Sequence, residues 1–356
     1  MIGLCEHSVR GKSLHRPMIL RGGIALAEIR KDLLRDNWVV IATGRAIRPT
    51  DLPVPAQGKA LKAQGFCPFC EGNEGVTPPE IMVNRKPGTE ENGPGWTVRA
   101  IPNKFTAFNL ATEFATETNG IYSFMTGFGS HEVVVETPEH DTELHQQNAE
   151  KISEVIEMLK RRHLDLAKDQ RIKYIQTYKN KGLFGGASLG HSHMQIVSLP
   201  YVPQELKGLW GYAQATGNCL ICDMLKQEKQ DQTRLVLESE NFIVMCPYAS
   251  RFAYETWVIP KNHARDFGNL PADHIPELAG VIKKVLGSMV DILNDPSYNL
   301  VINTSPVNVE NGPETHWFIE IFPRLIVQAG LEVSTGYYMN LISPEWAAET
   351  LKEKIS

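Results

Sequence analysis

The stretch that decides the fold is Gly190-His191-Ser192-His193-Met194-Gln195, which carries two histidines one residue apart. Alternate side chains of a β-strand point to the same face, so His191, His193 and Gln195 are predicted to project together. A similar order of possible metal ligands occurs twice in the chain, but this pair of histidines occurs once. Comparing the two copies therefore separates a shared scaffold from the residues that carry a reaction.

Length and charge narrow the class of protein. A chain of 356 residues is long enough for two domains of ordinary size. The formal net charge is −5 and no long Lys/Arg run is present, which excludes broad electrostatic binding of nucleic acid or of an anionic membrane. No apolar run reaches the roughly 18 residues that would span a bilayer. We expect a soluble cytoplasmic protein with an N-terminal extension over residues 1–27.

Four of the six cysteines form two C-x-x-C pairs, Cys67 with Cys70 and Cys219 with Cys222. In a cytosolic chain this spacing favours a metal site over a disulfide. Thioredoxin-like redox chemistry is the competing interpretation. It is disfavoured because neither pair is predicted to open a helix directly after a buried strand, and because suitable histidines follow both pairs.

The two pairs begin an internal repeat. Each is followed by a strand, a run that ends in a histidine, an amphipathic helix, a second strand and a second histidine. The first copy places these elements at residues 96–101, 131–140, 142–168 and 173–178, and the second at 242–246, 255–263, 278–289 and 298–303. The two histidines of each copy lie 51 and 53 residues apart, which favours an ancient duplication. Glycines and prolines break the pattern at residues 202–217, where we place the domain boundary.

Each copy offers two thiolates and two imidazoles, the closed tetrahedral set that suits zinc. The candidate ligands are Cys67, Cys70, His140 and His191 in the first copy, and Cys219, Cys222, His263 and His316 in the second. His131 is the alternative to His140, although it begins a predicted strand whereas His140, like His263, follows one. Both sites are predicted to be structural, because a complete shell of four ligands leaves no open position for substrate.

The second copy keeps the metal ligand His316 but has Phe318 and Glu320 where the first has His193 and Gln195. A neutral imidazole is a good nucleophile near pH 7, and its attack on phosphorus gives a covalent phosphoramidate. Gln195 can donate a hydrogen bond to a phosphoryl oxygen but cannot supply a proton. This combination favours group transfer over hydrolysis.

The glycine-rich stretch 180–190 precedes the histidines. Its glycines would let backbone amides approach an anion, with Asn180, Lys181 and Ser188 as side-chain donors. A tight turn between two strands is the alternative interpretation of the same residues.

These residues resemble the galactose-1-phosphate uridylyltransferase branch of the histidine-triad superfamily, and the similarity extends from about Glu28 to Tyr338. Hydrolases of that superfamily carry H-x-H-x-H, whereas the transferase branch carries H-x-H-x-Q, as this chain does. The resemblance implies that His193 takes the nucleotidyl group and that Gln195 steadies the phosphoryl oxygens. It also implies that His140, rather than His131, completes the first zinc site.

The resemblance further implies an α+β fold of two tandem histidine-triad-like domains, each an antiparallel sheet with packed helices. The first domain, residues 28–202, would be catalytic, and the second would cover residues 203–356. Family members pair as homodimers, which we expect here. The family's nucleotide contacts are matched by Arg45, Arg48, Asn103, Phe105, Asn180 and Ser188.

Several positions depart from the family pattern. The motif is H-S-H-M-Q instead of H-P-H-G-Q, Ala187 replaces a cysteine, and Lys104 replaces an acidic residue. Residues 333–338 lack the Tyr-Glu pair that contacts the hexose in the galactose enzymes. Together with the second Cys2His2 set, these departures resemble the plant-type ADP-glucose phosphorylases, in which phosphate is an acceptor.

Three functions follow as hypotheses. The first is transfer of a nucleoside monophosphate from a UDP-glucose or UDP-galactose type of nucleotide sugar to a hexose 1-phosphate through His193. The second is an ADP-glucose phosphorylase-like adenylyl transfer to phosphate. The third is a zinc-scaffolded binding protein without turnover.

Overall fold

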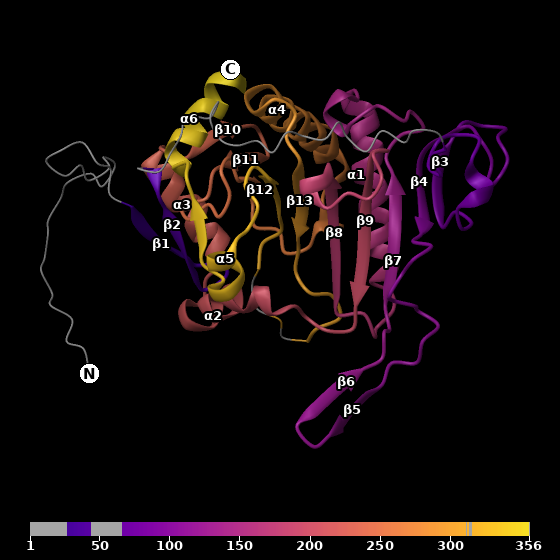
Figure 1. Ribbon diagram of the computed structural model, residues 1–356, viewed down its shortest axis with the longest axis horizontal. Helices are drawn as coiled ribbons and strands as arrows, with labels where there is room; N and C mark the ends of the chain where they lie inside the picture. The colour runs from indigo at the N-terminus through magenta and orange to yellow at the C-terminus, as the bar shows by residue number, and fades with distance from the viewer. Residues whose placement is uncertain (1–26, 44–65, 311, 313–314, 356) are drawn as a thin grey trace, which may run out of the picture.

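A ten-stranded antiparallel sheet forms the centre of the protein in the computed structural model, which describes residues 27–43, 66–310, 312 and 315–355 (Figure 1). Arg45 and Arg48 lie outside the described residues. Across the sheet the strands follow the order β10, β11, β12, β14, β13, β8, β9, β7, β4, β3. Their bounds are β3 Met82–Arg85, β4 Trp96–Pro102, β7 Ser130–Val135, β8 Tyr174–Lys181, β9 His193–Leu199, β10 Leu235–Glu238, β11 Phe242–Met245, β12 Thr256–Pro260, β13 Tyr298–Asn303 and β14 Phe318–Pro323.

The two sequence copies meet at the middle of this sheet. Strand β8 of the first copy pairs with its counterpart β13 of the second, in a register that places Asn180 opposite Asn299. The strand order on one side of this pair repeats the order of the equivalent strands on the other side. The prediction of two similar antiparallel units is confirmed. The join between β8 and β13 was not predicted.

One face of the sheet is covered by α1 (Ala149–Leu166) and α4 (Ile275–Leu293), which also pack on each other (Figure 1). Met194 and Ile196 of β9 belong to the same buried cluster as the apolar stripes of these helices. Because strand side chains alternate, His193 and Gln195 face the opposite side of the sheet.

Helix α1 begins seven residues later than the predicted start at residue 142. The side chain of Asn148 caps it by accepting a hydrogen bond from the Lys151 amide. The residues just before the cap form a separate 3-10 turn, Leu144–Gln146. Strand β8 extends three residues beyond the predicted end at 178, as far as Lys181.

The other face is covered over β10 to β12 by α2 (Lys207–Thr216) and α3 (Leu220–Asp231), whose apolar residues share a core with Trp257. The segment 202–217, where glycines break the sequence pattern, thus contains a helix. Gly208 belongs to its first turn and lies so close to the Leu34 carbonyl oxygen that a Cβ atom would collide with it.

The remaining elements lie around these layers. A small sheet joins β1 (Glu28–Asp32), β2 (Asn37–Ile41) and β15 (Tyr338–Asn340), and the C-terminal region adds α5 (Gly330–Thr335) and α6 (Pro344–Ile355). The hairpin of β5 (Thr116–Asn119) and β6 (Tyr122–Met125) projects away from the body (Figure 1). Among the described residues, none of the helices has the length and apolar character needed to cross a membrane.

Candidate active site and metal centres

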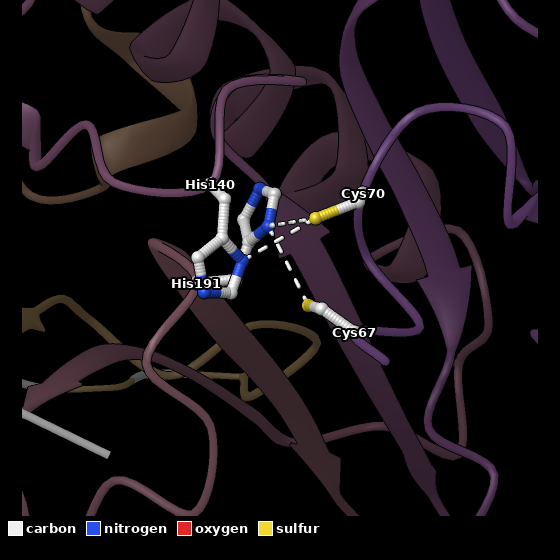
Figure 2. A group of neighbouring side chains, drawn as sticks. All are labelled: Cys67, Cys70, His140 and His191. Carbon is white, nitrogen blue, oxygen red and sulfur yellow. Dashed lines mark hydrogen bonds between the residues drawn. The ribbon is translucent and has the colours of Figure 1, made fainter. Parts of the chain in front are cut away.

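The first four predicted ligands, Cys67, Cys70, His140 and His191, come together at one end of the sheet (Figure 2). The Nδ1 atom of His191 lies 3.7 Å from the Sγ atoms of both cysteines. The Nδ1 atom of His140 lies 3.3 Å from Cys70 Sγ. Metal–ligand bonds of the usual zinc lengths place neighbouring S and N ligands about 3.5 Å apart in a tetrahedron. The group therefore fits one tetrahedral metal ion.

The ring of His191 is oriented by its second nitrogen. Nε2–H donates to the carbonyl oxygen of Thr137 at 2.8 Å, which leaves the lone pair of Nδ1 facing the thiols. His131, the alternative ligand, is not one of the four grouped residues. The geometry therefore matches the set that contains His140.

The second set, Cys219, Cys222, His263 and His316, gathers in the same way. The Nδ1 atoms of His263 and His316 lie 3.3 and 3.5 Å from Cys222 Sγ. Cys219 is the N-cap of α3, and Cys222 lies in the first turn of that helix. The sequence pattern did not predict this helix, which follows α2 rather than a buried strand.

His193 is the first residue of β9, so His191 precedes the strand instead of sharing it. The expected alternation of side chains therefore applies to His193 and Gln195. The side chain of His191 instead points toward Cys67, Cys70 and His140. The Nδ1–H group of His193 donates to the His191 carbonyl oxygen at 2.7 Å. Burial lowers the pKa of His193 to about 4, so the ring is neutral at pH 7. This tautomer leaves the lone pair on Nε2 unused by that bond.

A cavity of about 640 Å³ adjoins this histidine, although the side chain is only 6% exposed. Its walls include His140, His191 and His193 on one side and the C-terminal end of α4 on another. A binding protein without turnover needs no pocket beside His193, so the cavity favours the two hypotheses in which this side chain meets a substrate.

The glycine-rich stretch forms a tight 3-10 turn, Leu183–Gly185, between β8 and β9. The amides of Gly185, Gly186 and Ala187 donate to carbonyl groups of the turn itself. A Cβ atom at Gly185 would lie 2.8 Å from the Tyr298 carbonyl oxygen, so close packing requires glycine there. These three amides therefore stabilise the turn instead of facing an anion, as the interpretation of the stretch as a tight turn between two strands predicts.

A buried ion pair lies directly behind the two histidines. The ammonium group of Lys179 donates to Glu136 at 2.9 Å and to Ser192 Oγ at 2.7 Å, and both charged residues are about 1% exposed. Sequence reasoning missed this pair. The signal in the sequence is alternation: once the strand is extended to Lys181, Lys179 lies on the same face as Ile175 and Thr177, which are buried.

Gln195 lies between side chains of the two neighbouring strands. Its Oε1 atom accepts hydrogen bonds from the hydroxyl group of Tyr178 at 3.0 Å and from Nε2 of His131 at 2.7 Å. Asn103 contacts the same imidazole, with Nδ2 at 3.2 Å from His131 Nε2. No pattern in the sequence indicated the hydrogen bond from Tyr178 to Gln195.

The other predicted contacts are more dispersed. Phe105 is 89% exposed, and its amide donates to Asn103 Oδ1 at 2.9 Å. Asn180 lines the cavity and accepts a hydrogen bond from Asn299 at 2.8 Å, whereas Ser188 is exposed.

In the second copy the equivalent positions serve packing and ion pairs. Phe318 packs against Trp257 with ring centroids 4.5 Å apart. Glu320 accepts from Arg35 at 2.9 Å and from Arg251 at 2.7 Å. Among the described residues, the second copy thus has a candidate metal-binding group with Phe318 at the position that His193 occupies in the first.

Comparisons with known proteins identify the family of the chain. The family model for the N-terminal domain of galactose-1-phosphate uridyl transferase matches residues 24–203, and the model for its C-terminal domain matches residues 205–347. An ADP-glucose phosphorylase from Arabidopsis thaliana is 35% identical over 92% of each chain. A galactose-1-phosphate uridylyltransferase from Thermotoga maritima is 28% identical, over 92% of this chain and 98% of the relative.

A solved structure extends the comparison to the fold. The crystal structure of an Arabidopsis thaliana ADP-glucose phosphorylase with bound ADP-glucose superposes with a TM-score of 0.75, at 34% identity, over 92% of this chain and 98% of that one. Both family models match in order and together cover most of the sequence. The chain therefore belongs to the galactose-1-phosphate uridylyltransferase family of transferases.

Proposed function

We propose that the protein moves a nucleoside monophosphate between a nucleotide sugar and a phosphorylated acceptor through a covalent nucleotidyl intermediate on His193. The observation that carries the proposal is the contact between His193 and the His191 carbonyl oxygen, because it fixes the tautomer of the imidazole. Its Nδ1–H is bound to the His191 carbonyl oxygen at 2.7 Å, so Nε2 has the lone pair that a nucleophile needs. The adjoining cavity gives a substrate access to the ring.

Two displacements at one phosphorus make up the reaction. His193 Nε2 attacks the α-phosphorus of the nucleotide sugar, a P–N bond forms, and the bond to the departing sugar 1-phosphate oxygen breaks. A phosphate oxygen of the acceptor then attacks the same phosphorus, and the P–N bond breaks to return the neutral imidazole. Because phosphate oxygens leave and attack, no acid must protonate a leaving group, and an amide donor such as Gln195 suffices.

The remaining predicted residues would bind the nucleotide. Arg45 and Arg48 supply positive charge for the phosphates, and an exposed aromatic ring at Phe105 offers a surface for the base or ribose. The proposed nucleotide contacts are Arg45, Arg48, Asn103, Phe105 and Asn180. Ser188 is proposed as a catalytic residue that, with Gln195, stabilises charge on the phosphoryl oxygens.

Both Cys2His2 groups are proposed to hold structural zinc ions. The mixed thiolate and imidazole ligands suit that metal, and such thiols persist in a reducing compartment, which supports a cytoplasmic location. A metal ion in the first group would hold the His191 ring and so steady the backbone carbonyl that orients His193.

Two donor classes are compatible with this site. A uridine nucleotide sugar with a hexose 1-phosphate as acceptor corresponds to the family name. An adenine nucleotide sugar with phosphate as acceptor is favoured by the similarity to the Arabidopsis phosphorylase. It is also favoured by the absence of the Tyr-Glu pair of the galactose enzymes from residues 333–338, where Tyr338 packs against Phe252 with ring centroids 5.4 Å apart.

A pulse and chase with labelled nucleotide sugars distinguishes these functions. We expect UDP-glucose, UDP-galactose or ADP-glucose carrying an α-32P label to transfer it to the protein, with a preference of at least about 100-fold for one base. Discharge by galactose 1-phosphate would support the uridylyltransferase, and discharge by phosphate the phosphorylase. Binding of all three nucleotide sugars without labelled protein would contradict transfer and support the zinc-scaffolded binding protein.

We also propose that the protein is a homodimer in which the β5–β6 hairpin packs against a second copy of the chain. Every residue of its two strands is exposed, with Ile121 between them 88%, Tyr122 76% and Phe124 58% exposed. A two-stranded hairpin alone is marginally stable in water, and apolar side chains on it gain from burial. Symmetric pairs of identical chains are the commonest way to bury such a surface.

Light scattering after gel filtration tests the hairpin interface. We expect the unmodified protein to elute with the mass of two chains, and Tyr122→Asp/Phe124→Asp to elute as one chain, because the carboxylates cannot be buried unpaired. Thr118→Asp on the neighbouring strand is the control for a charge on a polar position. A dimer that persists in the double variant, or a monomeric unmodified protein, would contradict the interface.

A further inference from the structure

The carbonyl end of Gln195 is held from both sides by strands that flank β9. Tyr178 of β8 lies directly opposite Gln195 in the strand register, and His131 of β7 lies two residues from the opposing Val133. The Tyr178 hydroxyl donates to Oε1 at 3.0 Å, and the Nε2–H of His131 donates at 2.7 Å. Both lone pairs of this oxygen are therefore used.

This arrangement determines where the amide NH2 group points. An amide is planar, so an oxygen bound by two donors leaves the nitrogen directed away from both of them. Gln195 and His193 share one face of β9, two residues apart. We propose that His131 and Tyr178 are positioning residues, which turn the Gln195 NH2 group toward the phosphoryl oxygens of a nucleotide attached to His193. This inference rests on the function proposed above.

The surroundings of both donors support this role. Burial raises the pKa of Tyr178, so its hydroxyl keeps the proton that it donates. The strand carrying His131 is tied to Asn103, whose amide donates to the His131 carbonyl oxygen at 2.8 Å. Because Nε2 carries the proton that is donated to Gln195, the lone pair of the imidazole is on Nδ1, which lies 3.5 Å from the side-chain nitrogen of Asn103 and can accept from it.

The second copy provides a contrast at the same position. Glu320 replaces Gln195 there, and its carboxylate accepts from the guanidinium groups of Arg35 and Arg251. The charged groups of Arg35 and Arg251 thus bind the Glu320 carboxylate, which has no N–H group and cannot donate a hydrogen bond to an anion. In the first copy two uncharged donors hold an amide, which keeps two N–H groups for an anion.

Tyr178→Phe and His131→Ala test the positioning role. Loss of a full oxyanion donor costs about 10²- to 10³-fold, so loss of one orienting bond is expected to slow nucleotidyl transfer to His193 about tenfold. The KM of the nucleotide sugar should change less than about twofold, because the amide acts in the transition state. Tyr174→Phe is the matched control, since this tyrosine is in the same strand but lies in a buried core. It should keep the unmodified rate.

A double-mutant cycle with Gln195→Ala separates positioning from general destabilisation. In the Gln195→Ala background, Tyr178→Phe and His131→Ala are expected to cause no further loss of single-turnover rate. The same tenfold loss in both backgrounds, or a loss confined to KM, would overturn the positioning role. Failure of the unmodified protein to become labelled at all would overturn the proposed function instead, and this is measured before any variant.

Discussion

Replacing His193 with glycine is expected to lower nucleotidyl transfer by about 10⁴- to 10⁶-fold, the size of loss seen when a covalent nucleophile is removed. The oriented Nε2 atom is the group to which the nucleotide becomes attached, and the rest of the cavity cannot replace a bond to phosphorus. The measurement is the initial rate of exchange between a labelled nucleotide sugar and its sugar 1-phosphate. Binding of the nucleotide sugar should change little, because substrate is held mainly by other residues.

His274→Gly provides a control for removing an imidazole elsewhere. This histidine precedes α4 in the second copy, where its ring packs near Phe242. The variant should retain the unmodified rate. Exchange by His193→Gly at more than about one hundredth of the unmodified rate would contradict a nucleophilic role, because covalent nucleophiles contribute far more than that.

Replacing Cys70 with alanine is expected to remove the metal ion of the first group and to reduce both stability and activity. Structural zinc sites in small domains contribute about 10–16 kcal/mol of apparent binding free energy. We therefore expect the free energy of unfolding to fall by at least about 3 kcal/mol even if the site relaxes partly. Activity should fall as well, because His191 loses its anchor and its carbonyl orients His193.

Cys222→Ala in the second copy is the comparison that isolates the effect on chemistry. It should also lose one metal equivalent and destabilise the protein, but labelling of His193 should persist at temperatures where the variant is folded. Cys246→Ala removes a buried thiol outside both groups and should keep both metal ions. Metal content by mass spectrometry, denaturant unfolding and labelling are measured on all three. Equal metal content in Cys70→Ala and Cys246→Ala would contradict the first metal site.

The eight residues of the two Cys/His groups could be predicted from the sequence because their signals are spacings along the chain. Each C-x-x-C pair brings two sulfur atoms together within one turn of chain, and the duplication indicates the histidines that accompany them. Only the choice of His140 over His131 needed the family resemblance. The strands bearing apolar runs were also recognised, and Tyr298–Asn303 has the predicted bounds. Such signals require no knowledge of how distant segments pair.

Features that depend on pairing between distant strands were missed. Nothing local in β8 or β13 shows that they lie side by side, because any exposed strand edge can accept a partner. Likewise, whether His131 faces a metal or Gln195 is decided by the register between β7 and β9, and a shift of one residue would turn its side chain to the other face. The position of His191 outside β9 is an error of strand boundary, the least predictable part of any element.

The covalent role of His193 is tested most directly by the mass of the protein after brief mixing with a nucleotide sugar. We predict that the unmodified chain gains one nucleoside monophosphate, that peptide mapping places the gain on His193, and that phosphate or a hexose 1-phosphate removes it. Turnover with an adduct on a different residue, or with no adduct while His193→Gly remains active, would contradict the covalent role of His193.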